Sequence, residues 1–119
     1  MEKLTEHAIE LSSYGIVVTF LDSDGNAVAP RTVTWSLTDQ AGTVINSRKD
    51  VSITNPTSIE TIVLSGDDLQ IITAGSRQEA RKVIIEGTYD DSTLGNDIPF
   101  RQEIQFVVDN ITEAVTPSA

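Results

Sequence analysis

The chain has no cysteine, so no disulfide holds it together and its core must form from apolar packing alone. Histidine is almost absent too, because His7 near the start is the only one. One terminal imidazole and no thiol leave few nucleophile and base pairs, and we expect no enzymatic activity. No apolar run approaches the roughly 20 residues of a membrane span, and residues 1–7 lack the basic and apolar regions of a secretion signal.

Basic residues are also scarce, with 8 Lys and Arg against 18 Asp and Glu and a net charge of −10. A surface of this sign repels phosphates, which argues against nucleic acid and anionic membrane as partners. We expect no cofactor. A protein partner, either a second copy or another protein, is the remaining class.

Residues 33–39 show the clearest pattern in the chain. Val33, Trp35 and Leu37 alternate with polar residues, which predicts a strand with one buried and one wet face. Trp35 is the only tryptophan, and its ring can bury on the order of 200 Å². We therefore expect a core anchored by Trp35, with Phe20 and Phe106 from two other apolar segments.

Several further segments favour short strands because they are rich in β-branched residues and end at turn residues. They are 8–11, 15–21, 43–45, 48–55, 58–64, 82–89 and 104–108, with 15–21 expected to be well buried. Residues 65–70 are expected to form a turn or one helical turn capped by Asp67. We expect a long polar loop at 90–97, whereas 71–81 fit strand, short helix or loop. Residues 1–4 are predicted to be loosely ordered, and 110–119 to form a flexible tail.

Seven to eight short strands with regular turns predict an all-β chain, folded as one antiparallel β-sandwich over residues 1–109. A small β-barrel is the alternative. The tryptophan lies in the third main strand, as in immunoglobulin-like sandwiches, although paired cysteines and a tyrosine before the sixth strand are missing.

In such a sandwich, alternate loops lie at one end. The loops at 22–26, 55–58 and 90–97 would then be neighbours and would bring five carboxylates together. Clustered carboxylates suit Ca²⁺, although the segment after Asp24 lacks the acidic residue that closes an EF-hand loop. Solvated turn residues are the alternative. The candidate ligands are Asp22, Asp24, Asp90, Asp91 and Asp97.

Arg77, Arg81 and Lys82 form a basic cluster in an acidic chain. The cluster either docks an acidic surface of a neighbouring copy or balances charge. Glu79 and Glu103 show no acid-base spacing, so we expect them to be exposed strand and loop charges.

Two motifs carry a resemblance to a known family: Val-Thr-Phe-x-Asp-x-Asp-Gly-Asn-x-Val from Val18, and Val-Thr-Trp-Ser-Leu-Thr-Asp-x-x-Gly-x-Val-Ile-Asn from Val33. With them the chain resembles a bacterial or bacteriophage immunoglobulin-like domain over roughly residues 14–109. An acidic, cysteine-free chain with Met1 and no export signal is closer to the phage type.

The resemblance implies a non-enzymatic structural or interaction module of a virion tail, neck or capsid decoration. Such a module assembles with itself or docks on a larger virion component, in the virion or the host cytoplasm. The alternative that the resemblance implies is a single domain of a bacterial surface adhesin, which binds protein or carbohydrate.

Overall fold

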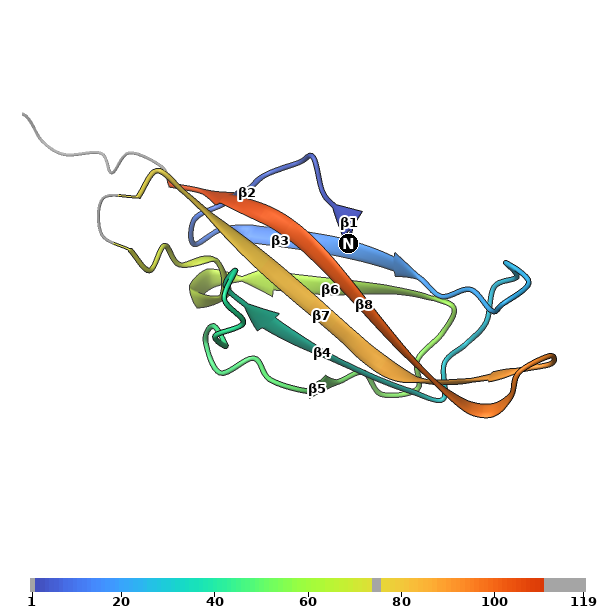
Figure 1. Cartoon of the computed structure of the whole chain (residues 1–119). Coiled ribbons are helices and arrows are strands. Elements are labelled where there is room, and N and C mark those ends of the chain that lie inside the picture. The colour runs from blue at the N-terminus through green and yellow to red at the C-terminus, as the bar shows by residue number, and fades with distance from the viewer. Residues whose placement is uncertain (1, 74–75, 111–119) are drawn as a thin grey trace, which may run out of the picture.

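Strands make up most of the structure, a computed structural model that describes residues 2–73 and 76–110 (Figure 1). The described residues form eight strands and one 3₁₀ helix, η1. The elements are β1 (Glu2–Lys3), β2 (Ala8–Ile9), β3 (Ser13–Thr19), β4 (Thr32–Thr38), β5 (Val51–Ser52), β6 (Ile59–Ser65), η1 (Gly66–Leu69), β7 (Gln78–Asp91) and β8 (Gly95–Asp109). The prediction of an all-β chain is confirmed.

The strands form two sheets that enclose the core. The larger sheet has the order β1-β8-β7-β4-β5, with β2 also paired to β8, and the smaller sheet contains β3 and β6. In Figure 1, β7 and β8 pass across β3 and β6, so the two sheets form two layers. All pairings are antiparallel except those of β1 and β2, which run parallel to β8. The sandwich is therefore mixed rather than purely antiparallel.

The core lies between the two sheets and includes all three predicted anchors. Trp35 is 7% exposed, Phe20 6% and Phe106 1%. The ring of Phe106 stacks on Tyr14 at a centroid distance of 5.0 Å, which ties β8 to β3. Together these residues belong to one cluster: Ala8, Tyr14, Ile16, Val18, Phe20, Val33, Trp35, Leu37, Ile45, Ile62, Leu64, Leu69, Val83, Ile85, Ile104, Phe106 and Val108.

Gly87 allows β4 and β7 to approach closely. In the β4–β7 ladder it lies opposite Val33, and in the β7–β8 ladder opposite Phe100. A Cβ at Gly87 would lie 1.9 Å from the backbone oxygen of Thr32 and 2.9 Å from the Phe100 ring. This close approach explains why a glycine occupies this position of β7.

The predicted long loop at 90–97 is wrong, because β7 and β8 continue through it as one long hairpin. Only residues 92–94 form the turn. The Asp91 carboxylate accepts hydrogen bonds from the backbone N–H groups of Thr93 at 2.7 Å and Leu94 at 2.9 Å. Gly95 then takes φ +111, a value that side chains disfavour. The polar residues of 90–97 predicted a loop, but the hydrogen bonds of a β-ladder join backbone groups and form between polar residues as well.

Other segments also differ from expectation. Residues 2–4 were expected to be loose, but β1 pairs with β8 and Leu4 N–H donates to Gln105 O at 2.9 Å. Residues 43–45 make one bridge, Thr38 to Val44, instead of a strand. In the undecided segment 71–81, β7 begins at Gln78, and residues 71–73 belong to no strand or helix.

Of the predicted tail, only Asn110 is among the described residues; its N–H donates to Arg77 O at 2.8 Å. Met1, Ala74, Gly75 and residues 111–119 lie outside them. Within the part of the chain that is described, no helix is long and apolar enough to cross a bilayer.

Candidate functional site

The predicted acidic loop at 22–26 lies at one end of the sandwich, beside the turn of the β7–β8 hairpin, which carries the aspartates of 90–97 (Figure 1). The Asp22 carboxylate accepts from Asp24 N–H at 3.0 Å and Asn26 N–H at 2.9 Å, which shapes its own turn. Asp91 reaches across and accepts from Ser23 N–H at 2.9 Å. Hydrogen bonds from Ser23, then Leu94 and Thr93, hold the pKa of Asp91 well below its ordinary value.

Arg31 supplies the cation at this end, and sequence analysis overlooked it. Its Nη1 lies 3.3 Å from Asp90 Oδ2, and its Nε lies 3.1 Å from Asp97 Oδ1. Arg31 is the only Lys or Arg between Lys3 and Arg48, and this isolated position was the feature of the sequence that could have pointed to its role. These contacts are exposed, so the ion pairs contribute little to stability.

Four of the five aspartates therefore shape turns or form ion pairs: Asp22, Asp90, Asp91 and Asp97. In residues 2–73 and 76–110, no group of three or more His, Cys, Asp or Glu side chains is placed to hold a metal ion. The calcium hypothesis stays a prediction, and a calorimetric titration with Ca²⁺ is its test.

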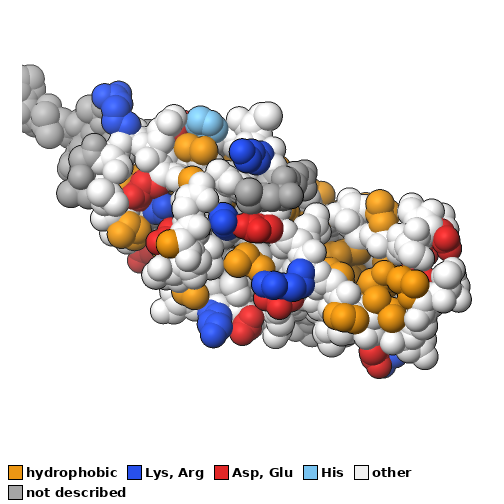
Figure 2. Space-filling view, in the orientation of Figure 1, with side chains coloured by type: hydrophobic (Ala, Val, Ile, Leu, Met, Phe, Trp, Pro, Cys, Tyr) orange, Lys and Arg blue, Asp and Glu red, His pale blue; other side chains and the backbone are white. Residues whose placement is uncertain are grey.

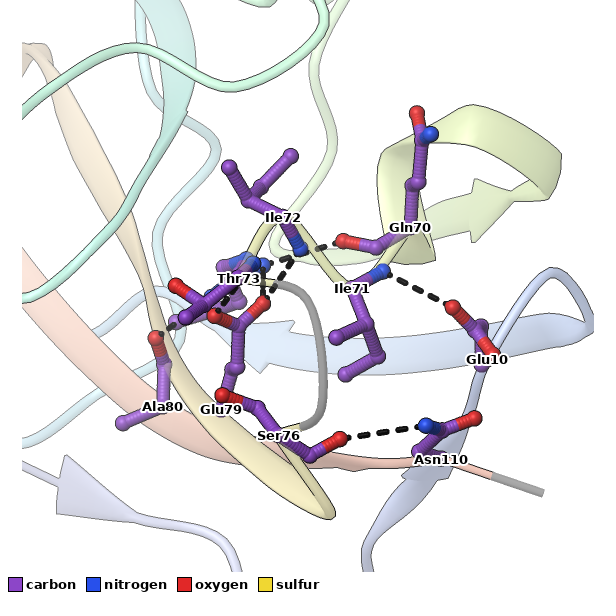
Figure 3. Close-up of polar contacts among 10 residues, drawn as sticks. Glu10, Gln70, Ile71, Ile72, Thr73, Ser76, Glu79, Ala80 and Asn110 are labelled. Atoms are coloured by element: carbon purple, nitrogen blue, oxygen red, sulfur yellow. Dashed lines mark hydrogen bonds and ion pairs between the residues drawn. The ribbon is translucent and has the colours of Figure 1, made fainter. Parts of the chain in front are cut away.

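The opposite end is closed by a buried polar cluster around Glu79 (Figure 3). The Glu79 carboxylate accepts from Ile72 N–H at 2.6 Å and Thr73 N–H at 3.1 Å. It also accepts from Arg81 Nη2 at 2.8 Å, and the same nitrogen donates to Gln70 O at 3.0 Å. These bonds fasten the segment before β7 to β7 itself.

Burial of Glu79 works to raise its pKa. The hydrogen bonds from Arg81, Ile72 and Thr73 outweigh burial and lower the pKa to about 2. Arg81 is 2% exposed and directed inward, in the row of Val83 and Ile85. Its Nε has no partner among the described residues.

Of the two alternatives for the basic residues, the contacts favour charge balancing over docking, because Arg81 and Lys82 both pair with carboxylates. Arg81 is buried, Arg77 is exposed, and Lys82 lies on the outer face of the larger sheet, where it pairs with Glu103 at 2.9 Å. Glu79 was expected to be exposed, but its side chain is 12% exposed. In the sequence, Arg81 alternates in step with the apolar Val83 and Ile85. A charged residue in such a row was the feature that could have indicated a buried ion pair.

A second buried carboxylate caps η1. Asp68 is fully buried and accepts from Arg48 Nε at 2.8 Å, Asn46 Nδ2 at 2.9 Å and Ser65 N–H at 3.1 Å. Burial works to raise its pKa, and these hydrogen bonds together lower it. Asp67, the predicted cap, is exposed. The hydrogen bonds of Asp68 and Glu79 therefore have a structural role, since they fix η1 and the segment before β7.

The outer face of β3 and β6 is the most distinctive surface. We expected β3 to be well buried, but only its inward face is, and Val17 is 65% exposed. Across the ladder, Ile59 is 58% and Val63 62% exposed. None of the eight residues on this face is charged: Ser13, Gly15, Val17, Thr19, Ile59, Thr61, Val63 and Ser65.

The larger sheet treats its outer face differently. Lys82 pairs with Glu103 there, and Arg101 Nε lies 3.6 Å from Glu86. Figure 2 shows blue and red side chains interspersed across the visible side of the molecule. Charged pairs of this kind keep an exposed sheet soluble, and the β3–β6 face lacks them.

A small pocket of about 200 Å³ opens near the acidic end, where β3 ends beside the β7–β8 hairpin. The rings of Phe20 and Phe100 meet edge to face at 5.5 Å, and Tyr89 lies 6.1 Å from Phe100. Arg101 and Gln102 add polar groups to its lining.

His7 is exposed, and its Nδ1 lies 3.0 Å from Asp109 Oδ1. No hydroxyl of the described residues hydrogen-bonds to this imidazole.

Comparisons of the chain with protein-family models, with curated proteins and with solved structures gave no significant match.

Proposed function

We propose that the protein is a non-enzymatic structural or interaction module, a small bacteriophage virion or tail-associated component. It assembles with copies of itself or docks on a larger virion component. The observation that carries this proposal is the uncharged β3–β6 face, with Val17, Ile59 and Val63 exposed in a chain of net charge −10. Exposed apolar patches without charges mark interaction surfaces.

The grouping of strands supports the immunoglobulin-like part of the proposal. In that family the second and fifth strands share one sheet, and the third, sixth and seventh share the other. Here β3 and β6 form one sheet, while β4, β7 and β8 lie side by side in the other. The link to bacteriophage rests on the sequence alone, on the two motifs together with the acidic and cysteine-free composition.

The neighbouring genes test the virion assignment. Genes for capsid, portal or tail proteins on either side support it. An exported reading frame with several tandem domains would contradict it and would favour a surface adhesin.

The aromatic pocket favours the second candidate, a surface domain that binds carbohydrate. A sugar ring fits a small site with aromatic walls and a few polar groups, which Phe20, Tyr89 and Phe100 together with Arg101 and Gln102 offer. An NMR titration with common monosaccharides tests it. Shifts confined to these residues, lost in Phe100→Ala, support the candidate; no shift at millimolar sugar rejects it.

A further inference from the structure

The outer edge of β6 is open. Among the described residues β6 pairs only with β3. Phe20 N–H donates to Ser58 O at 2.8 Å and Gly66 N–H to Ser12 O at 3.0 Å, at the two ends of this ladder. Bonded and non-bonded pairs alternate in an antiparallel ladder. The even residues of β6 therefore bond to β3, and the odd ones, 59 to 65, direct their N–H and C=O groups outward.

This edge lacks the devices that normally protect exposed strands. Residues 59–65 contain no lysine, no proline and no bulge, and the only charged side chain, Glu60, binds Thr57 N–H at 2.7 Å. The other edge of this sheet is bordered by residues 4–6, since Tyr14 Oη donates to Glu6 O at 2.6 Å. At the edge of the larger sheet, β5 is only two residues long.

Three groups on the β6 edge are already occupied. Thr57 Oγ1 donates to Ile59 O at 2.7 Å, and Ser65 N–H donates to Asp68 Oδ2 at 3.1 Å. The Ser65 C=O accepts the first hydrogen bond of η1, which begins at Gly66 with Ser65 as its N-cap. The N–H of Ile59 and both groups of Thr61 and Val63 have no backbone partner among the described residues. The occupied groups thus lie at opposite ends of the strand.

We propose that β6 pairs with β6 of a second copy, antiparallel about a two-fold axis at Ile62. This inference rests on the proposed assembly role and names its partner and surface. Thr61 faces Val63 of the second copy, and Ile59 faces its Ser65. The occupied groups of Ile59 and Ser65 then lie opposite each other at the two ends, and the free groups of Thr61 and Val63 meet one another in the middle. About four hydrogen bonds form, and residues 59–65 overlap over their full length, whereas a shift of two residues shortens this overlap.

Charge explains why the occupant is a second copy. Two chains of net charge −10 repel each other wherever acidic surfaces meet. The outer face of β3 and β6 has no charged residue, so here the copies form a four-stranded sheet without like charges opposite each other. A basic partner would instead bind more favourably at the acidic end of the sandwich, around the β7–β8 turn, than at this uncharged face. The interface is isologous and closes after two copies.

The dimer should be weak, because pairing of one strand buries less than the roughly 1,200 Å² of a standard interface. Sedimentation equilibrium of the full chain should give a dissociation constant in the micromolar range. Val63→Lys should raise this constant at least about tenfold, since it places a charge at the pairing edge. The matched control Val17→Lys adds the same charge to the same face, one strand away, and should change the constant less than about threefold.

Amide exchange identifies the edge. Protection of the Thr61 and Val63 amides should rise with protein concentration. The amides of Gly15 and Val17, on the opposite edge of the same sheet, should not change. Concentration-dependent protection at Gly15 and Val17 instead would overturn pairing through β6.

The register has its own test because the chain contains no cysteine. In the proposed register Thr61 and Val63 of the two copies lie about 5.5 Å apart between Cα atoms, which suits a disulfide. A mixture of Thr61→Cys and Val63→Cys should therefore cross-link to each other on oxidation. A self-cross-link of either variant would overturn the axis at Ile62.

A wild-type chain that stays monomeric up to about 1 mM would overturn the inference altogether. That result leaves docking on a larger component standing, since the neighbouring genes test it separately.

Discussion

Trp35 lies where the third main strand faces both neighbouring strands, opposite Ile85 of β7 and Val51 of β5. Replacing it by alanine removes the largest ring of the core and leaves a cavity. We expect Trp35→Ala to lower the free energy of unfolding by about 3–5 kcal/mol in urea denaturation. Val17→Ala, at a 65% exposed position, should change it by less than about 0.5 kcal/mol. Equal effects would place Trp35 outside the core.

Glu79 tests the buried ion pair. Glu79→Gln leaves Arg81 buried without its charged partner, and we expect a loss of about 3 kcal/mol at pH 7 by chemical denaturation. Glu86→Gln breaks the exposed contact with Arg101 and should cost less than about 0.5 kcal/mol. If both variants matched the wild type, the Glu79 cluster would have no role in stability.

The same residue predicts a pH dependence. The folded pKa of Glu79 is about 2, below its ordinary value of 4.5, so the folded state binds protons less readily than the unfolded state. Its contribution is complete above pH 4.5 and is lost as the pH falls toward 2. The stability difference between wild type and Glu79→Gln should shrink over this interval. A difference that stays constant from pH 5 to pH 2 would contradict the lowered pKa.

At the scale of elements, the contact between β4 and β7 depends on Gly87. In Gly87→Ala the new methyl group meets the Thr32 carbonyl, a backbone atom that cannot rotate away. We expect a loss of about 1–3 kcal/mol in thermal or chemical denaturation. Gly15→Ala is the matched control, because its Cβ meets only Thr61 Cγ2 at 3.6 Å. It should be neutral or stabilising by up to about 1 kcal/mol.

The elements that could be predicted are those whose side chains alternate between core and solvent. Val33, Trp35 and Leu37 in β4 and Ile62 and Leu64 in β6 are all buried as predicted, but Ser36 and Thr38, on the predicted wet face of β4, are buried as well. The hairpin with its turn at 92–94 could not be predicted in this way, because its ladder consists of backbone hydrogen bonds between polar residues. The parallel pairing of β1 with β8 joins segments about a hundred residues apart, which no local pattern records.

Over the whole molecule, the candidate sites were harder to predict than the fold. Asp22 and Asp91 were correctly placed at one end, where Asp91 accepts from Ser23 in the loop of Asp22. Arg31, the cation that pairs with Asp90 and Asp97 there, was overlooked. Arg81 was read as a surface charge because its partner carboxylate and the Gln70 carbonyl become neighbours only in the folded chain. The exposure of the outer face of β3 likewise depends on which strands pack against it, and the arrangement of strands in the two sheets cannot be read from β3 alone.

The parallel pairing of β1 and β2 with β8 has a mechanical consequence. Tension applied between Lys3 and Asn110 pulls β1 and β8 in opposite directions along their own axes. Bonds such as Leu4 N–H to Gln105 O and Glu10 N–H to Asp109 O are then loaded together in shear, instead of opening one after another. A protein in a virion or on a cell surface that bears load along its chain would resist extension in this direction. Force spectroscopy with handles at these two positions, compared with handles at Lys3 and Ser92, measures that anisotropy; equal rupture forces would exclude it.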